Sequence, residues 1–122
     1  MTPKKITLKY FQLSEFICPC CGQQHMQQKV LEMLDHAREI ADIPFSITSG
    51  WRCRTHNKNV NGKPGSAHLY GKAVDISAIG SRVRFKVIRG LIQAGFIRIG
   101  IGTGFIHADN DATKDSEVIW LY

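Results

Sequence analysis

The chain has 122 residues, of which 43% are hydrophobic and 21% charged, and this composition is typical of one globular domain with a buried core. Its apolar runs are broken by Arg, Lys or Gly well short of membrane-spanning length, so no transmembrane helix is predicted. The formal net charge of +6 favours anionic partners, such as nucleic acid, anionic lipid or an acidic cell-wall polymer.

The N-terminal stretch MTPKKITLKYFQLSEF has lysines but lacks the apolar segment and cleavage site of a signal peptide. We therefore expect synthesis in the cytoplasm without a signal peptide. Residues 6–16 are predicted to run extended and then to form a short helical turn capped by Ser14. From about residue 24 to 42 the apolar residues recur at helical spacing, which predicts an amphipathic helix that ends before Pro44.

The rest of the chain alternates predicted strands with one more helix. Residues 45–50 and 72–78 have the composition of strands, and a second long helix is predicted at 81–94. Three further strands, expected to form an antiparallel meander, are predicted at 96–102, 105–109 and 117–122. The expected fold class is α+β, with helices packed on one face of a small antiparallel sheet in a single domain over residues 1–122.

Three polar side chains fall at positions where they could meet. Asp75 alternates with apolar residues on its predicted strand, and His107 does the same on another strand, where it shares a face with Asp109. His68 lies just before a turn at Gly71 and could reach the same point. Two imidazoles and one carboxylate, with a position left open, form the ligand set of a catalytic zinc site. From spacing alone, a surface histidine and an Asp–Arg ion pair are the alternatives.

Four stretches of the sequence resemble one known family in the same order. SAHLYGKAVD, residues 66–75, matches the S-x-H-x-x-G-x-A-x-D signature of the zinc D-Ala-D-Ala carboxypeptidases. That family includes phage L-alanyl-D-glutamate endopeptidases and shares its fold with the hedgehog signalling domain. The chain resembles a short phage-type member, over about residues 10–109, also through YFQLSEFICPCCG, ITSGWRCRTHN and FIHAD.

The resemblance implies a role for each residue that matches the family pattern. His68, Asp75 and His107 would bind one catalytic zinc ion. Arg52 would bind the carboxylate of the substrate or stabilise the oxyanion, and Ser66 would hydrogen-bond the substrate near the scissile amide. A surface ion pair for Arg52 and a loop hydroxyl for Ser66 are the alternatives.

The general base is where the chain departs from the family pattern. Many members carry a Glu three residues before the second histidine, or a His two residues before it, where this chain has Gly104 and Phe105. Asp109 is the predicted replacement because it shares a face with His107, although a carboxylate there could instead orient the ligand histidine. Other candidate bases are Asp111, His56 and Glu117.

The cysteines form a separate cluster in the sequence. Cys18, Cys20 and Cys21 fall in one turn, and Cys53 follows Arg52. We interpret CPCC as a C-x-C spacing followed by a C-C spacing. A zinc ribbon usually has two separated C-x-x-C pairs, so CPCC fits it poorly. A disulfide from this turn to Cys53, inert thiols and a distorted second metal site all remain open.

The sequence therefore leads to two hypotheses from different classes. The first is a monomeric zinc-dependent peptidase that hydrolyses peptide stems of bacterial peptidoglycan, as a D-Ala-D-Ala carboxypeptidase or an endolysin-type endopeptidase. Such an enzyme would reach the cell wall after phage-type release, with no membrane partner. The second is a non-catalytic zinc-binding module for the cell wall or nucleic acid. Nucleic acid is disfavoured because the basic residues form no patch interleaved with aromatic residues.

Overall fold

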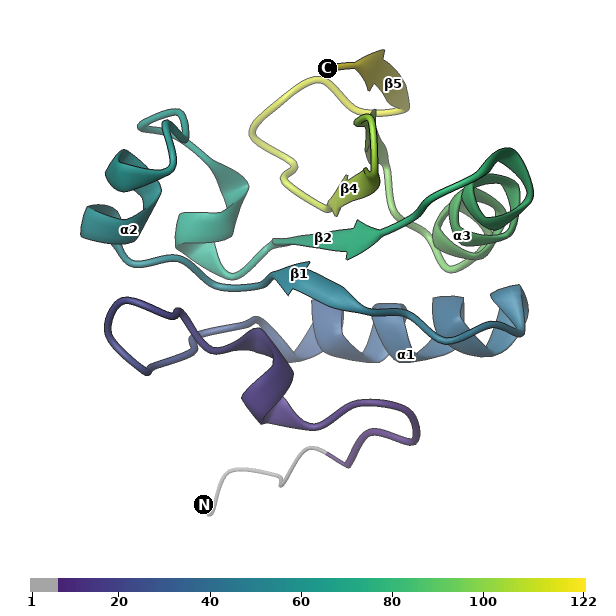
Figure 1. Ribbon diagram of the computed structural model, residues 1–122, viewed down its shortest axis with the longest axis horizontal. Helices are drawn as coiled ribbons and strands as arrows, with labels where there is room; N and C mark the ends of the chain where they lie inside the picture. Colours follow the sequence, from purple (N-terminus) through teal and green to yellow (C-terminus); the bar gives the residue numbers. More distant parts are fainter. Residues whose placement is uncertain (1–6) are drawn as a thin grey trace.

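The structure is a computed structural model that describes residues 7–122. Figure 1 shows the arrangement of the elements. The chain forms, in order, α1 (Gln28–Ala41), β1 (Ile47–Ser49), α2 (Arg54–Asn59), β2 (Ala73–Ser77), α3 (Ser81–Gln93), β3 (Arg98–Ile101), β4 (Phe105–Asp109) and β5 (Val118–Leu121). Two short 3-10 helices lie at Leu13–Phe16 and Ala67–Tyr70.

The five strands form one sheet in the order β1-β2-β4-β3-β5. The first four pair antiparallel with their neighbours, whereas β5 pairs parallel with β3. The α+β fold class is confirmed, but the predicted antiparallel meander is wrong for its last strand. The reason is that β2 already pairs with one edge of β4. The chain leaving β4 therefore crosses to the free edge of β3, where Val118 pairs with Arg98 and the two strands run in the same direction.

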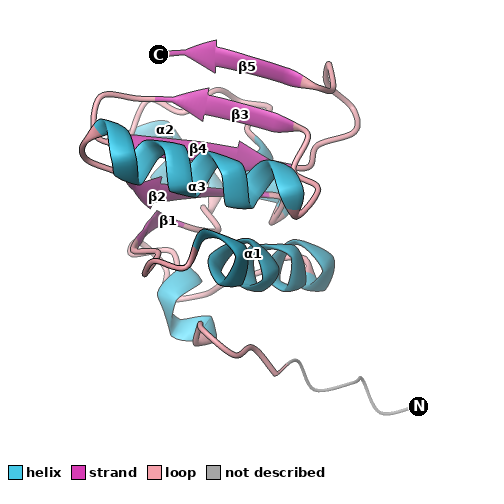
Figure 2. Cartoon of the chain, turned by 90° about the vertical axis from the view of Figure 1, so that its right-hand side faces the viewer, coloured by secondary structure: helices cyan, strands magenta, loops and turns pink. Residues whose placement is uncertain are grey.

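Helices α1 and α3 pack against each other and against one face of the sheet, as Figure 2 shows. Each helix is amphipathic, and its apolar side joins the sheet in a single core. The two helices approach closely at Gly90, where an added Cβ would lie 2.5 Å from the carbonyl oxygen of Ala37. The core includes Leu31, Leu34, Val74, Ile76, Val87, Leu91, Ile99 and Ile106. The other face of the sheet remains available for polar side chains.

Helix α1 begins at Gln28, later than the periodicity predicts. The preceding residues are extended because the Gln27 N–H donates to the carbonyl oxygen of Gly71 at 2.9 Å. Helix α2 was not predicted, because its six residues have no apolar periodicity. Within residues 7–122, none of the helices is long and apolar enough to cross a membrane.

The N-terminal turn also differs in its cap. The 3-10 helix begins after Gln12, whose backbone N–H donates to the Glu15 carboxylate at 2.7 Å. Ser14 lies inside this turn, so its predicted role as the cap is wrong. Residue 6, where the predicted extended stretch begins, lies outside the described residues.

Candidate functional site

Asp75 and His107 face each other across the two central strands of the sheet. They are directly paired in the antiparallel register of β2 and β4, and the Asp75 Oδ1 lies 3.0 Å from the His107 Nδ1. Their neighbours Val74, Ile76, Ile106 and Ala108 point into the core on the helix side. Both polar side chains therefore project from the face opposite the helices, as the alternation of the sequence predicts.

His68 reaches the same point from the 3-10 helix Ala67–Tyr70. The turn after this helix has Gly71 at φ +70°, and a Cβ there would lie 2.0 Å from the carbonyl oxygen of His25, so only glycine fits. The Nδ1 of His68 lies 2.8 Å from the carbonyl oxygen of Gly50, to which it must donate. In the neutral form of this ring the Nε2 therefore carries the lone pair, and it lies 3.3 Å from the Asp75 Oδ1.

The three side chains fit a zinc ion in number, chemistry and spacing. One ligand atom from each of His68, Asp75 and His107 lies within 4.8 Å of the others. The His68 Nε2 is buried and has no hydrogen-bond partner among the residues that the structure describes. A buried nitrogen of this kind is costly unless it binds something, and two imidazoles with one carboxylate leave a fourth position open on zinc.

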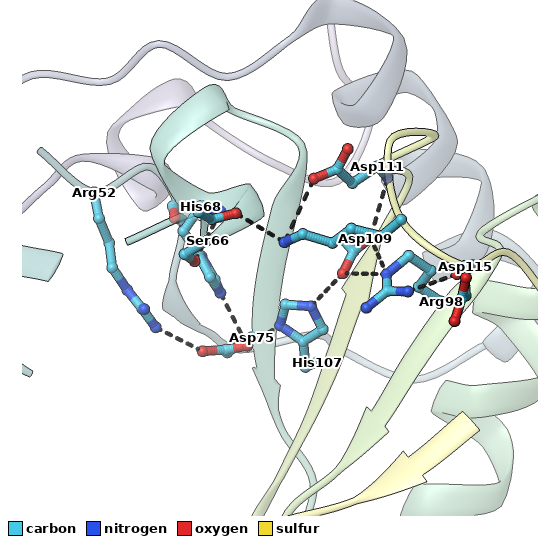
Figure 3. Close-up of polar contacts among 12 residues, drawn as sticks. Arg52, Ser66, His68, Asp75, Arg98, His107, Asp109, Asp111 and Asp115 are labelled. Carbon is cyan, nitrogen blue, oxygen red and sulfur yellow. Dashed lines mark hydrogen bonds and ion pairs between the residues drawn. The ribbon is translucent and has the colours of Figure 1, made fainter. Parts of the chain in front are cut away.

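Asp109 lies on the far side of the His107 ring from Asp75, as Figure 3 shows. Its Oδ2 is 2.7 Å from the His107 Nε2, and its Oδ1 accepts the backbone N–H of Asp111 at 3.0 Å. Arg98 adds an ion pair at 3.1 Å, and the Asp109 residue is only 1% exposed. The carboxylate is therefore held by partners within the protein and fixes the orientation of the imidazole.

The charges of this cluster depend on one another. Burial alone would raise the pKa of Asp75, but the hydrogen bond with His107 and the nearby His68 ring hold that pKa well below its usual range. Burial likewise opposes the charged form of His107, but Asp109 and Asp75 raise the pKa of its imidazole above the ordinary value. The pKa of Asp109 is lowered despite burial, chiefly by its hydrogen bond with His107. Both carboxylates are therefore ionised at neutral pH.

Arg52 lies beside Asp75 and is held by three acceptors. Its Nε donates to the Ser49 hydroxyl at 2.9 Å, and its two terminal nitrogens donate to Asn57 at 3.3 Å and to the Asp75 Oδ2 at 3.1 Å. Ser66 caps the 3-10 helix, since its hydroxyl oxygen accepts the backbone N–H of His68 at 3.3 Å. Its hydroxyl proton stays free to be donated.

A cleft of about 690 Å³ opens over these residues. The only carboxylates that line it, within residues 7–122, are Asp75 and Asp109. The other candidate bases, His56, Asp111 and Glu117, do not line this cleft. Its basic side chains are Arg52, Lys63, Arg98 and Lys114, and its aromatic wall is formed by Phe105, Trp120 and Tyr122. The cleft is therefore suited to an anionic ligand.

Trp120 and Tyr122 of this aromatic wall were not predicted from the sequence. The Trp120 ring packs on the His107 ring with centroids 5.5 Å apart. This packing requires Gly100 on the strand between them, where an added Cβ would lie 2.8 Å from the indole. Arg98, also missed, stacks on the same indole with its guanidinium carbon 4.9 Å from the ring centroid. The only signal for either residue is alternation on β3 and β5, and it does not reveal which strands are neighbours.

Comparison with known proteins agrees with this site. The peptidase M15 family model matches residues 9–109. The chain belongs to the peptidase M15 family. It is also 35% identical over 75 residues to the zinc D-Ala-D-Ala carboxypeptidase of Streptomyces albus G. That match covers 62% of this chain but 28% of the Streptomyces protein, so the chain spans less than a third of that relative. The family resemblance of the SAHLYGKAVD stretch is thus confirmed, and the candidate zinc ligands of this M15 chain lie inside the matched residues.

Proposed function

We propose that this M15 chain is a zinc-dependent peptidase that hydrolyses peptide stems of bacterial peptidoglycan. The observation that supports the proposal most is the buried His68 Nε2, which has no hydrogen-bond partner among residues 7–122. This atom lies next to Asp75 and His107 in a basic cleft. The name of the Streptomyces relative supports the zinc ion and a D-Ala-D-Ala substrate.

In this proposal, His68, Asp75 and His107 hold one catalytic zinc ion. Zinc bound there would polarise the scissile carbonyl and lower the pKa of a water molecule to about 7. The His68 side chain is fixed for this task by the Gly50 carbonyl, and the His107 side chain by Asp109. Both imidazoles are thereby held in the orientation that directs a lone pair toward the same point.

Two roles remain possible for Asp109, and the geometry favours the second. As a general base, Asp109 would have to reach the substrate, yet the residue is 1% exposed and its carboxylate already accepts hydrogen bonds from its neighbours. As a positioning residue, it needs only the contact with His107 that it already makes. We propose the positioning role, and the sequence-based prediction of a base at Asp109 stays a prediction.

Arg52 and Ser66 are proposed to bind the substrate. The Arg52 guanidinium is anchored by Ser49 and Asn57, so it can offer its outer face to a carboxylate without losing orientation. The free proton of the Ser66 hydroxyl can be donated to a carbonyl of the peptide. Peptide stems with free carboxylates would be attracted by the lysines and arginines that line the cleft.

The proposal extends to where the enzyme acts. We propose that it is a monomer of endolysin or carboxypeptidase type that is made in the cytoplasm and reaches the cell wall after phage-type release. The net charge of +6 supports binding to an anionic wall. Whether it cuts the D-Ala-D-Ala bond or an L-alanyl-D-glutamate bond depends on the loops around the cleft.

One observation favours a second candidate, a zinc-binding module without hydrolytic activity. Within the described residues, the cleft offers no carboxylate beyond Asp75 and Asp109, and both are engaged by protein donors. A peptidase usually requires a group that can accept a proton near the scissile bond. In the peptidase proposal, Asp109 would take this role only after a rearrangement that brings its carboxylate to the substrate.

The decisive experiment is digestion of purified peptidoglycan, followed by mass spectrometry of the released peptides, with zinc and with a chelator. The proposal expects zinc-dependent release, whose product masses name the bond. His68→Ala should abolish release, whereas His36→Ala, on the exposed side of α1, should not. A folded, zinc-loaded protein that releases no peptide would favour the binding module. Steeply salt-sensitive binding to unrelated DNA would point to nucleic acid instead.

A further inference from the structure

The four cysteines lie together outside the cleft, at the junction between the N-terminal segment and the segment that carries Arg52. The sulfur atoms of Cys18, Cys21 and Cys53 all lie within 4.8 Å of one another. Cys18 is fully buried, Cys53 is half-buried and Cys21 is exposed. None of the residues that line the cleft belongs to this cluster.

The spacing of the sulfur atoms fits a metal ion better than a disulfide. The Cys18 and Cys53 sulfur atoms are 3.6 Å apart, whereas a disulfide bond is about 2.05 Å long. Zinc–sulfur bonds of about 2.3 Å at tetrahedral angles place two sulfur atoms about 3.8 Å apart. All four cysteines are free thiols in the structure. The cluster therefore has the dimensions of a zinc thiolate site.

The local backbone corrects our interpretation of the CPCC spacing. Cys18 and Cys21 are themselves a C-x-x-C pair, with Cys20 as one of the intervening residues. The turn between them closes through the Gly22 N–H, which donates to the Cys18 carbonyl at 2.9 Å, and Gly22 has φ +72°. Both thiols thus point from one tight turn toward Cys53. Only the second C-x-x-C pair of a zinc ribbon is missing, and Cys53 supplies a third ligand from a distant segment.

Backbone donors around the cluster stabilise thiolates, which are the form that binds zinc. The Cys53 N–H donates to the Cys18 sulfur at 3.5 Å, and the His56 N–H donates to the Cys53 sulfur at 3.4 Å. Burial raises the pKa of Cys18. The backbone N–H groups of Cys53, Cys20 and Cys21 lower this pKa by more than burial raises it, to about 7.

We propose that Cys18, Cys21 and Cys53 bind a second, structural zinc ion, with Cys20 as the fourth ligand. Cys20 is exposed, lies in the same turn between Cys18 and Cys21, and is the one cysteine left in the sequence. Closed four-ligand sites of cysteine are typical of structural zinc. The proposal does not depend on the peptidase function.

The second zinc would brace the wall of the cleft. Cys53 directly follows Arg52, and the Trp51 N–H donates to the Phe16 carbonyl at 3.2 Å. An ion that links Cys18 and Cys21 to Cys53 would fix the segment that orients the Arg52 guanidinium.

The test is to count metal ions and thiolate ligands in protein purified under reducing conditions. We expect two zinc ions per chain in the wild type and one in either Cys21→Ser or His107→Ala. Replacement of zinc with cobalt separates the sites, because only thiolate ligands give an intense charge-transfer absorption in the near ultraviolet. That absorption should persist in His107→Ala and disappear in Cys21→Ser, whose side chain is exposed and whose loss need not unfold the core.

The wild type alone provides an independent measurement. Its thiols should react slowly with a thiol reagent until a chelator removes the metal. Cys20→Ser should release the second zinc to a chelator faster than the wild type does, and unchanged release would overturn the assignment of Cys20. One zinc per chain in the wild type, with no thiolate absorption for cobalt, would overturn the whole proposal. A disulfide in freshly reduced and desalted protein would overturn it as well.

Discussion

Replacing Asp109 by Asn tests whether this carboxylate orients His107 or acts as the base. The substitution keeps the size of the side chain but removes the negative charge that lies 2.7 Å from the His107 Nε2. If Asp109 is a positioning residue, His107 becomes a weaker and less well oriented ligand. Zinc affinity should then fall about 10–100-fold, the usual cost of losing a carboxylate behind a ligand histidine. This corresponds to about 1.4–2.7 kcal/mol.

The assay is a competition for zinc between the protein and a chromophoric chelator, combined with kcat measured at saturating zinc. For Asp109→Asn we expect a weakened zinc affinity and a kcat that largely recovers when zinc is in excess. Arg98→Gln is the matched control, because it removes the 3.1 Å ion pair to Asp109 but leaves the contact with His107. It should bind zinc nearly as well as the wild type.

The opposite pattern would refute the positioning role. If Asp109 is the general base, Asp109→Asn should bind zinc as tightly as the wild type and lose about 10²–10⁴-fold in kcat at saturating zinc. That result would require the buried carboxylate to reach the substrate, in conflict with its 1% exposure in the structure.

Three further substitutions test other parts of the structure. Gly90→Ala should lower the free energy of unfolding by about 1–3 kcal/mol, because the added Cβ would lie 2.5 Å from the carbonyl oxygen of Ala37. This clash should outweigh the higher helix propensity of alanine, and urea denaturation measures the difference. Arg52→Lys should lower kcat/KM about 10–100-fold for a substrate with a free carboxylate. Lysine cannot replace the planar guanidinium that donates to Ser49, Asn57 and Asp75 together. The kcat/KM for a substrate amidated at that carboxylate should fall less. Asp111→Asn should destabilise the fold by about 1–3 kcal/mol at neutral pH, since the pKa of Asp111 is lowered by hydrogen bonds from Thr113 despite burial. Because a lowered pKa stabilises the fold only while the carboxyl is ionised, the difference from the wild type should shrink as the pH falls below about 4, and a constant difference would contradict the assignment.

The closeness of His68, Asp75 and His107 was predictable from the sequence because its determinants are local. The spacing between His68 and Asp75 is fixed by the turn at Gly71, whose positive φ only glycine adopts easily. The alternation on β2 and β4 places Asp75 and His107 on one face whatever the order of the strands. Neither inference requires knowledge of the tertiary structure.

What the sequence did not predict depends on long-range pairing. The parallel β5 follows from β2 occupying the edge of β4, and no local pattern encodes that choice. The contact of Trp120 with His107 depends on the same pairing. Asp109 was assigned to the correct face, but only the structure reveals which side of the imidazole it contacts.

The placement of the candidate metal ligands also bears on how such a protein can change during evolution. Asp75 and His107 are held by the hydrogen-bond ladder of the two strands β2 and β4 in the interior of the sheet, whereas Lys63 and Lys114 come from loops at the rim of the cleft. Insertions in those loops can reshape the rim without shifting the ladder, because surface loops tolerate length changes at low cost. Selection can therefore alter the preferred peptide while the geometry of the ligands is inherited intact.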